Sequence, residues 1–126
     1  MRAVLAITTL FIIVAGFVYL LYRYAQDSDY RISNQTAKQL LAAKAFDVVL
    51  DVRTDLERET LGSYPGSTHI QSADLEHLMP NLFPDQKIRI LVYCNTGQRA
   101  RKATEILHAM GYKNSVYISG SHKSIM

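Results

Sequence analysis

The segment from Ala3 to Tyr22 contains no charged residue, and it limits how this chain can fold more than any other feature. About 20 predominantly apolar residues are enough for a helix to cross the hydrocarbon core of a bilayer. Arg2 and Arg23 bracket the segment, and tyrosines near its end suit a membrane interface. A helix in the core of a globular domain would normally show a polar face, and this segment has none. We therefore expect residues 1–24 to form a single-pass membrane anchor that inserts through residues 3–22.

The anchor is expected to stay attached to the domain that follows it. The apolar run is longer than the roughly 7–15 residues of a secretory signal, and Arg23 stands where a cleavage site needs small residues. Residues 25–32 are short and polar, which indicates a tether. The charges leave the orientation open, because Arg2 favours a cytoplasmic N-terminus while Arg31 and Lys38 lie on the other side of the membrane.

The composition of the chain excludes several classes of function. The net charge is +3 and no basic run exceeds Arg99–Lys102, so a nucleic-acid-binding surface is not expected. The four histidines lack the Cys/His spacing of a zinc site, and neither a metal nor an organic cofactor is expected. Cys94 is the single cysteine, which excludes an internal disulfide.

Residues 33–126 are expected to form one α/β domain with a mainly parallel central sheet, because helical and strand patterns alternate along them. Ser33 is a suitable N-cap, Pro80 and Pro84 are expected to end the second helix, and Gly111 stands where a helix C-terminus favours glycine. Strands are predicted at 46–52, 68–70, 88–93 and 115–118, and helices at 34–43, 72–79 and 98–110. Ligands of such sheets bind beyond the carboxyl ends of the strands.

Cys94 lies at one of these strand ends. It follows the apolar run Ile88–Tyr93 and opens the sequence Cys94-Asn95-Thr96-Gly97-Gln98-Arg99, which leads directly into a helical pattern. The unpaired N–H groups and the dipole of a helix N-terminus favour a thiolate over a thiol and attract anions. The position therefore predicts a nucleophilic cysteine. The alternative is a buried and unreactive thiol, which is the usual state of a free cysteine.

Two segments ahead of this loop resemble signatures of the rhodanese, or sulfurtransferase, homology domain. Asp51-Val52-Arg53, followed by a glutamate such as Glu59, is similar to the first signature. Residues 66–73 are similar to a Gly-His-Ile-x-Gly-Ala element, with two residues inserted and Ser72 in place of the second glycine. The resemblance covers nearly all of residues 33–120 and implies a three-layer α/β/α fold.

The loop from Cys94 to Arg99 carries the most specific likeness. It fits the six-residue active-site loop of the family, with Gly97 in the fourth place and Arg99 in the sixth. Together with residues 105–112, it resembles the small exported rhodaneses of the phage shock protein E type. This subgroup implies a single-domain thiosulfate sulfurtransferase outside the cytoplasm, so we expect the domain on the periplasmic, or extracytoplasmic, side of the membrane.

The resemblance also implies a reaction in two displacement steps. Cys94 would attack the outer sulfur of thiosulfate and release sulfite, and a thiophilic acceptor such as cyanide or a thiol would then remove the sulfur from the Cys94 persulfide. Arg99 would attract and orient the anionic donor, and Gly97 would permit a close approach to the loop. The residues implied in the loop and in substrate binding are Asn95, Thr96, Gly97, Gln98 and Arg99.

The sequence is less specific about the roles of Asp51, Arg53 and the histidines. Asp51 and Arg53 either form an ion pair that braces the loops around the site or act directly in the reaction, and the sequence leaves both open. His69 is expected to be a structural histidine that bonds to backbone, since most buried polar side chains are satisfied in this way. The other histidines are expected at the surface.

Two other functions are compatible with a thiolate in a loop before a helix. A cysteine phosphatase or arsenate reductase requires an arginine as the sixth residue after the cysteine, and this chain has Ala100 there. A membrane-tethered persulfide carrier or redox-sensing module, which passes sulfur to a protein partner, would use the same residues as the enzyme.

Overall fold

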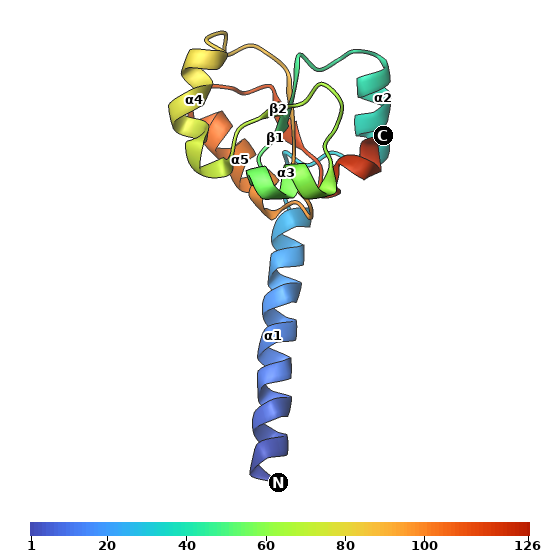
Figure 1. The fold of residues 1–126 in the computed structure, drawn as a ribbon, viewed down its shortest axis with the longest axis vertical. Helices are drawn as coiled ribbons and strands as arrows, with labels where there is room; N and C mark the ends of the chain where they lie inside the picture. The colour runs from blue at the N-terminus through green and yellow to red at the C-terminus, as the bar shows by residue number, and fades with distance from the viewer.

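The computed structural model describes residues 1–126 as a long N-terminal helix joined to an α/β body. The helix, α1 (Arg2–Gln26), extends away from the body along most of its length (Figure 1). The elements of the body are α2 (Asn34–Ala42), β1 (Val48–Asp51), α3 (Asp55–Leu61), β2 (Thr68–His69), η1 (Ser72–Asp74), α4 (Leu75–Leu82), β3 (Ile90–Tyr93), α5 (Gln98–Ala109), β4 (Ser115–Tyr117) and η2 (His122–Ile125).

The four strands form one parallel sheet in the order β2-β1-β3-β4. Successive side chains of a strand point to opposite faces of the sheet. Leu50 and Val92 accordingly belong to a core that contains residues of α4 and α5, while Leu91 and Tyr93 belong to a second core on the other face, with residues of α2 and η2. The expected α/β class, three layers and parallel sheet are confirmed.

Most predicted elements match the structure, and the differences lie in the helices. No helix was expected at residues 55–61, yet α3 forms there because the Thr54 hydroxyl accepts a hydrogen bond from Glu57 N while the Glu57 carboxylate accepts one from Thr54 N. The expectation that Pro80 ends the second helix is wrong. Pro80 lies inside α4, which continues because Leu75 and Met79 are fully buried and hold its inner face against the core.

The helix α1 is long and apolar enough to cross a membrane, judged by length and composition. Its side chains are exposed from Met1 to Arg23, and Ala25 is its one buried residue. Residues 27–32, part of the segment expected to be a tether, run beside β4. Ile32 N donates to Tyr117 O at 2.9 Å, and Tyr117 N donates to Tyr30 O at 3.0 Å. The chain therefore passes from α1 into the body without a free linker.

Candidate active site

Cys94 immediately follows β3, at the carboxyl edge of the sheet. The pairing of Asp51 with Tyr93 aligns the ends of β1 and β3, so the chain segments that follow both strands lie next to each other. The Cys94 side chain is 1 % exposed, and its Sγ accepts hydrogen bonds from Gly97 N at 3.1 Å and Ala100 N at 3.4 Å. These two N–H groups lie at the start of α5 and favour a negative charge on the sulfur.

Gly97 has a backbone conformation and a packing environment that strongly favour glycine. Its φ is +102°, in the left-handed region that L residues rarely adopt. A Cβ built on it would lie 2.8 Å from Ser119 Cα and 3.0 Å from Ala25 Cβ. The absence of a Cβ at Gly97 therefore lets the segment after β4 and the last turn of α1 pack closely against the loop.

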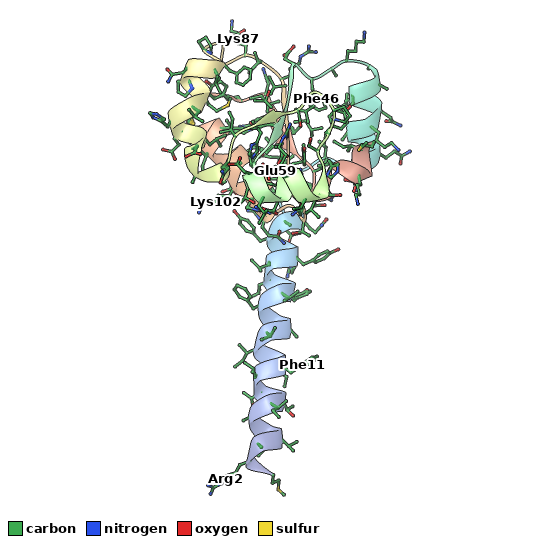
Figure 2. All side chains as sticks on the ribbon, in the orientation of Figure 1. Arg2, Phe11, Phe46, Glu59, Lys87 and Lys102 are labelled. Atoms are coloured by element: carbon green, nitrogen blue, oxygen red, sulfur yellow. The ribbon has the colours of Figure 1, made fainter.

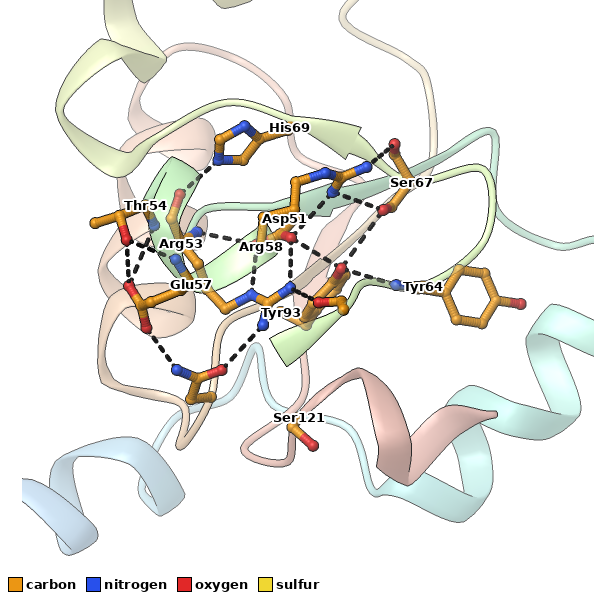
Figure 3. Close-up of polar contacts among 12 residues, drawn as sticks. Asp51, Arg53, Thr54, Glu57, Arg58, Tyr64, Ser67, His69, Tyr93 and Ser121 are labelled. Carbon is orange, nitrogen blue, oxygen red and sulfur yellow. Dashed lines mark hydrogen bonds and ion pairs between the residues drawn. The ribbon is translucent and has the colours of Figure 1, made fainter. Parts of the chain in front are cut away.

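Arg99 forms an ion pair with Glu57 rather than projecting freely from the loop. The distances are 2.6 Å from Nη1 to Oε1 and 2.8 Å from Nη2 to Oε2. The hydrogen bond from Arg99 lowers the pKa of Glu57 to about 2, and the same bond raises the pKa of Arg99. Asn95 Nδ2 also donates to Glu57 Oε2, at 2.5 Å (Figure 3). Glu57 thus binds both sides of the Cys94 loop.

The glutamate that contacts the Cys94 loop is Glu57 and not Glu59, the residue expected after Asp51-Val52-Arg53. Glu59 is exposed and makes none of these contacts, whereas Glu57, two residues earlier, makes them all. A signal for Glu57 is present in the sequence, because Thr54-x-x-Glu57 is the pattern of a helix capping box. That pattern predicts both α3 and the direction of the Glu57 side chain back toward Thr54.

Asp51 and Arg53 form a fully buried ion pair beside the loop. Arg53 Nε donates to Asp51 Oδ1 at 3.0 Å and Nη2 donates to Oδ2 at 2.8 Å, and both side chains are 0 % exposed (Figure 3). Arg58 and Tyr93 also donate to Asp51. Burial acts to raise the pKa of Asp51, but the hydrogen bonds from Arg53 outweigh it, and the pKa lies below its ordinary value. Arg53 Nη1 reaches Asn95 Oδ1 at 3.3 Å, which connects this pair to the Cys94 loop.

The hydrogen bonds to the Cys94 sulfur come from backbone N–H groups and not from a histidine. His69 Nε2 lies 2.6 Å from Arg53 O, a bond to backbone of the expected kind. His122 is 5 % exposed and its Nδ1 has no hydrogen-bond partner, so the expectation of a surface position is wrong for it. Burial lowers the pKa of His122. Its burial arises from η2, which packs on the α2 face of the sheet and was not predicted.

The other loop residues lie at the rim of the site. Thr96 is exposed, and its hydroxyl bonds to the Gln98 side chain. Gln98 Nε2 lies 3.5 Å from the carbonyl of Leu21 in α1. No group of three or more His, Cys, Asp and Glu side chains is placed to hold a metal ion. The arrangement therefore presents a thiol with two amide donors, braced by two ion pairs.

The family model of the rhodanese-like domain matches residues 33–125. The chain belongs to the rhodanese-like family. Its structure is similar to that of RPA3614 from Rhodopseudomonas palustris CGA009, a protein of unknown function described as a possible tyrosine phosphatase. The two are 25 % identical, with a TM-score of 0.70, and the match covers 83 % of this chain and 85 % of the other. A rhodanese-related protein from Thermoplasma volcanium is 28 % identical, with a TM-score of 0.64 and coverage of 75 % and 88 %.

The human single-domain sulfurtransferase TSTD1 shares the fold of this rhodanese-like domain, at 22 % identity and a TM-score of 0.65, with coverage of 77 % of this chain and 95 % of the human one. Among curated proteins, no relative matches the chain. The family match spans the sheet, the Asp51–Arg53 pair and the Cys94 loop, and it begins after α1.

Proposed function

We propose that this rhodanese-like protein is a sulfurtransferase that carries sulfane sulfur on Cys94. The observation that supports this most directly is the pair of N–H donors on the Cys94 sulfur, from Gly97 and Ala100. A thiolate is the nucleophilic form of cysteine, and amide donors at a helix start stabilise it. The membership of the rhodanese-like family supports the same class of reaction.

The donor in this proposal is thiosulfate or a similar anion. The Cys94 thiolate attacks the outer sulfur of thiosulfate, the S–S bond of the donor breaks, and sulfite leaves with the electron pair. A persulfide anion remains on Cys94, and the N–H groups of the loop hold its charge. Cyanide or a thiolate then attacks the outer sulfur, and the Cys94 thiolate is released. No metal or organic cofactor takes part in either step.

We further propose that α1 anchors the domain to a membrane, with the domain on the extracytoplasmic side as in the phage shock protein E type. The support is the uncharged run from Ala3 to Tyr22 and the exposure of its side chains along α1. An apolar helix without a covering partner in its own chain is stable where lipid surrounds it.

The decisive experiment is mass spectrometry of the full chain after incubation with thiosulfate. We expect one added sulfur atom on the peptide that contains Cys94, and its loss after addition of cyanide. Cys94→Ser is the matched control, because serine keeps the shape of the side chain and removes the nucleophilic sulfur. An unmodified Cys94 peptide in a folded protein would contradict the proposal.

A phosphatase is the second candidate, favoured by the likeness to RPA3614. Phosphate binding by such enzymes requires an arginine six residues after the cysteine, where Ala100 stands, and Arg99 is already paired with Glu57. Hydrolysis of an aryl phosphate that Cys94→Ser abolishes would favour the phosphatase. Steady-state turnover with thiosulfate and cyanide distinguishes the enzyme from a persulfide carrier. A carrier loads once from thiosulfate and then stalls, because it lacks its protein partner.

A further inference from the structure

The body of the protein caps the C-terminal end of α1. The last four carbonyl groups of a helix have no partners within it. Arg101 Nη1 donates to Tyr24 O at 2.6 Å, and its guanidinium lies 4.0 Å from the centre of the Tyr24 ring. Tyr117 Oη donates to Ala25 O at 2.6 Å. These bonds come from α5 and β4, so α1 and the body are joined by both secondary structure and side-chain contacts.

The junction places the Cys94 loop next to the apolar segment itself. Ala25 is fully buried and lies only three residues after Tyr22, a rise of about 4.5 Å along a helix. Gln98 reaches back to the carbonyl of Leu21, which belongs to the uncharged run. In Figure 2, Lys102 of α5 lies beside the end of α1, and Lys87 lies at the opposite end of the body.

The surface at this end of the body also exposes apolar side chains. The helix α3 lies at the end of the body that α1 joins (Figure 1). Leu56 is 68 % exposed and Leu61 is 50 % exposed, and both belong to α3. Beyond residues 1–26 the only other exposed large apolar side chains are Leu82 and Met126. Exposed leucines beside an anchor that leaves the membrane are suited to the interface between headgroups and acyl chains.

We infer from the capped junction, from its short distance to Tyr22 and from the exposed leucines that α1 holds the Cys94 loop against the bilayer surface. The site then exchanges sulfur with amphiphilic thiols and persulfides whose tails lie in the membrane. The inference rests on the sulfur transfer and the anchor proposed above. An amphiphilic thiolate attacks the outer sulfur of the Cys94 persulfide, the bond between Sγ and that sulfur breaks, and the products are the alkyl persulfide and the Cys94 thiolate. The reverse reaction loads Cys94 from an alkyl persulfide.

The Cys94 loop packs against the last turn of α1, which brings the loop close to the apolar segment. The thiol is 1 % exposed, and Ala25 of α1 covers the loop at Gly97. Thr96 is the exposed residue of the loop rim. A molecule concentrated at the membrane surface therefore meets the loop beside α1, at the rim where Thr96 is accessible.

The first test measures the depth of the loop without relying on activity. The full chain is inserted into lipid vesicles, and a fluorophore is attached at Thr96→Cys in a Cys94→Ser background. Lys87→Cys in the same background is the matched reference at the far end of the body. We expect lipids that carry a quencher near the headgroup to quench the Thr96 probe several-fold more strongly. Equal quenching of the two probes would overturn the inference.

The second test measures the preference for amphiphilic acceptors. Octanethiol and a short water-soluble thiol are compared as sulfur acceptors in the same vesicles, and we expect the longer thiol to react about tenfold faster. A Gly/Ser linker of about eight residues, spanning roughly 15 Å, is then inserted between Tyr22 and Arg23 to lift the body from the bilayer. We expect this insertion to abolish the preference, and the same linker between Pro84 and Asp85 to preserve it.

The outcomes separate the inference from the function on which it rests. If the protein with the linker after Tyr22 prefers octanethiol as strongly as the protein without it, the substrate class is overturned. The sulfur transfer itself then remains established. Transfer to neither thiol, together with strong quenching of the Thr96 probe, would overturn the proposed sulfurtransferase and the substrate class with it.

Discussion

Arg99 and Glu57 form a two-pronged ion pair across the Cys94 loop, with N–O distances of 2.6 and 2.8 Å. The pair joins the first residues of α5 to α3, which precedes them by some forty positions in the sequence. It also means that the positive charge proposed to attract the donor is balanced in the absence of substrate. The donor anion must therefore compete with a carboxylate for Arg99, and the two residues should affect donor binding in opposite directions.

The first prediction uses this opposition. Arg99→Ala should raise the KM for thiosulfate about tenfold, equivalent to about 1.4 kcal/mol, because it removes the cation that orients the donor. Glu57→Gln keeps the shape of the side chain and releases the Arg99 charge, so it should lower the KM. Steady-state kinetics with cyanide as acceptor measures both values. An Arg99→Ala protein with an unchanged KM would remove Arg99 from donor binding.

The second prediction concerns stability in acid. The pKa of Glu57 falls from an ordinary value of 4.5 to about 2 in the folded protein, chiefly through the hydrogen bond from Arg99. A depressed pKa contributes stability above the ordinary pKa, and the contribution is lost as the pH falls from about 4.5 to about 2. We expect about 1–2 kcal/mol, since the pair is partly exposed and screened by solvent.

Glu57→Gln tests this by removing the titrating group. The free energy of unfolding, measured by urea titration between pH 6 and pH 3, should decrease less steeply with acid in this variant than in the wild type. Identical slopes would show that the ion pair contributes nothing to stability over this range.

The third prediction contrasts a buried and an exposed ion pair. Asp51→Asn leaves the Arg53 guanidinium buried without its counter-charge, which should lower the free energy of unfolding by about 3–5 kcal/mol. Asp47→Asn is the matched control, because Asp47 pairs with Arg89 at 3.1 Å in an exposed position where solvent screens the charges, so this substitution should cost far less stability. Urea unfolding of both variants decides this, and similar losses would contradict the buried role of Asp51.

The sequence predicted the parts of the fold that depend on local patterns. The strand before Cys94 and the helix after Gly97 follow from an apolar run and an amphipathic repeat, and Ser33 caps its helix as expected. The short helix α3 was missed because a charged stretch has no apolar periodicity, although its capping pattern was present at Thr54. Local signals thus define most elements.

The contacts around the site depend on tertiary structure and were less predictable. The burial of His122 and the packing of Ala25 over Gly97 bring together residues far apart in the chain. The polar composition of residues 25–32 indicated a tether, but a polar segment can bond along a sheet edge as well as extend into water, and here it runs beside β4. Such choices are set by the surface that the rest of the fold offers.

The last prediction tests the close packing at the loop. Gly97→Ala should lower the free energy of unfolding by about 2–4 kcal/mol, because the new Cβ is strained at φ +102° and meets Ser119 Cα at 2.8 Å and Ala25 Cβ at 3.0 Å. Gly66→Ala is the matched control: its φ is +81° but nothing lies within 4 Å of the added Cβ, so strain alone should cost about 1 kcal/mol.

The two glycine variants should also differ at the thiol. A clash at Gly97 pushes the last turn of α1 away from the loop, so iodoacetamide should alkylate Cys94 faster in Gly97→Ala than in the wild type, and at the wild-type rate in Gly66→Ala. Both rates are measured under conditions in which circular dichroism shows each variant to be folded. An unchanged rate of Cys94 alkylation in a destabilised but folded Gly97→Ala protein would contradict this prediction. It would mean that the packing of Ala25 against the loop does not restrict access to Cys94.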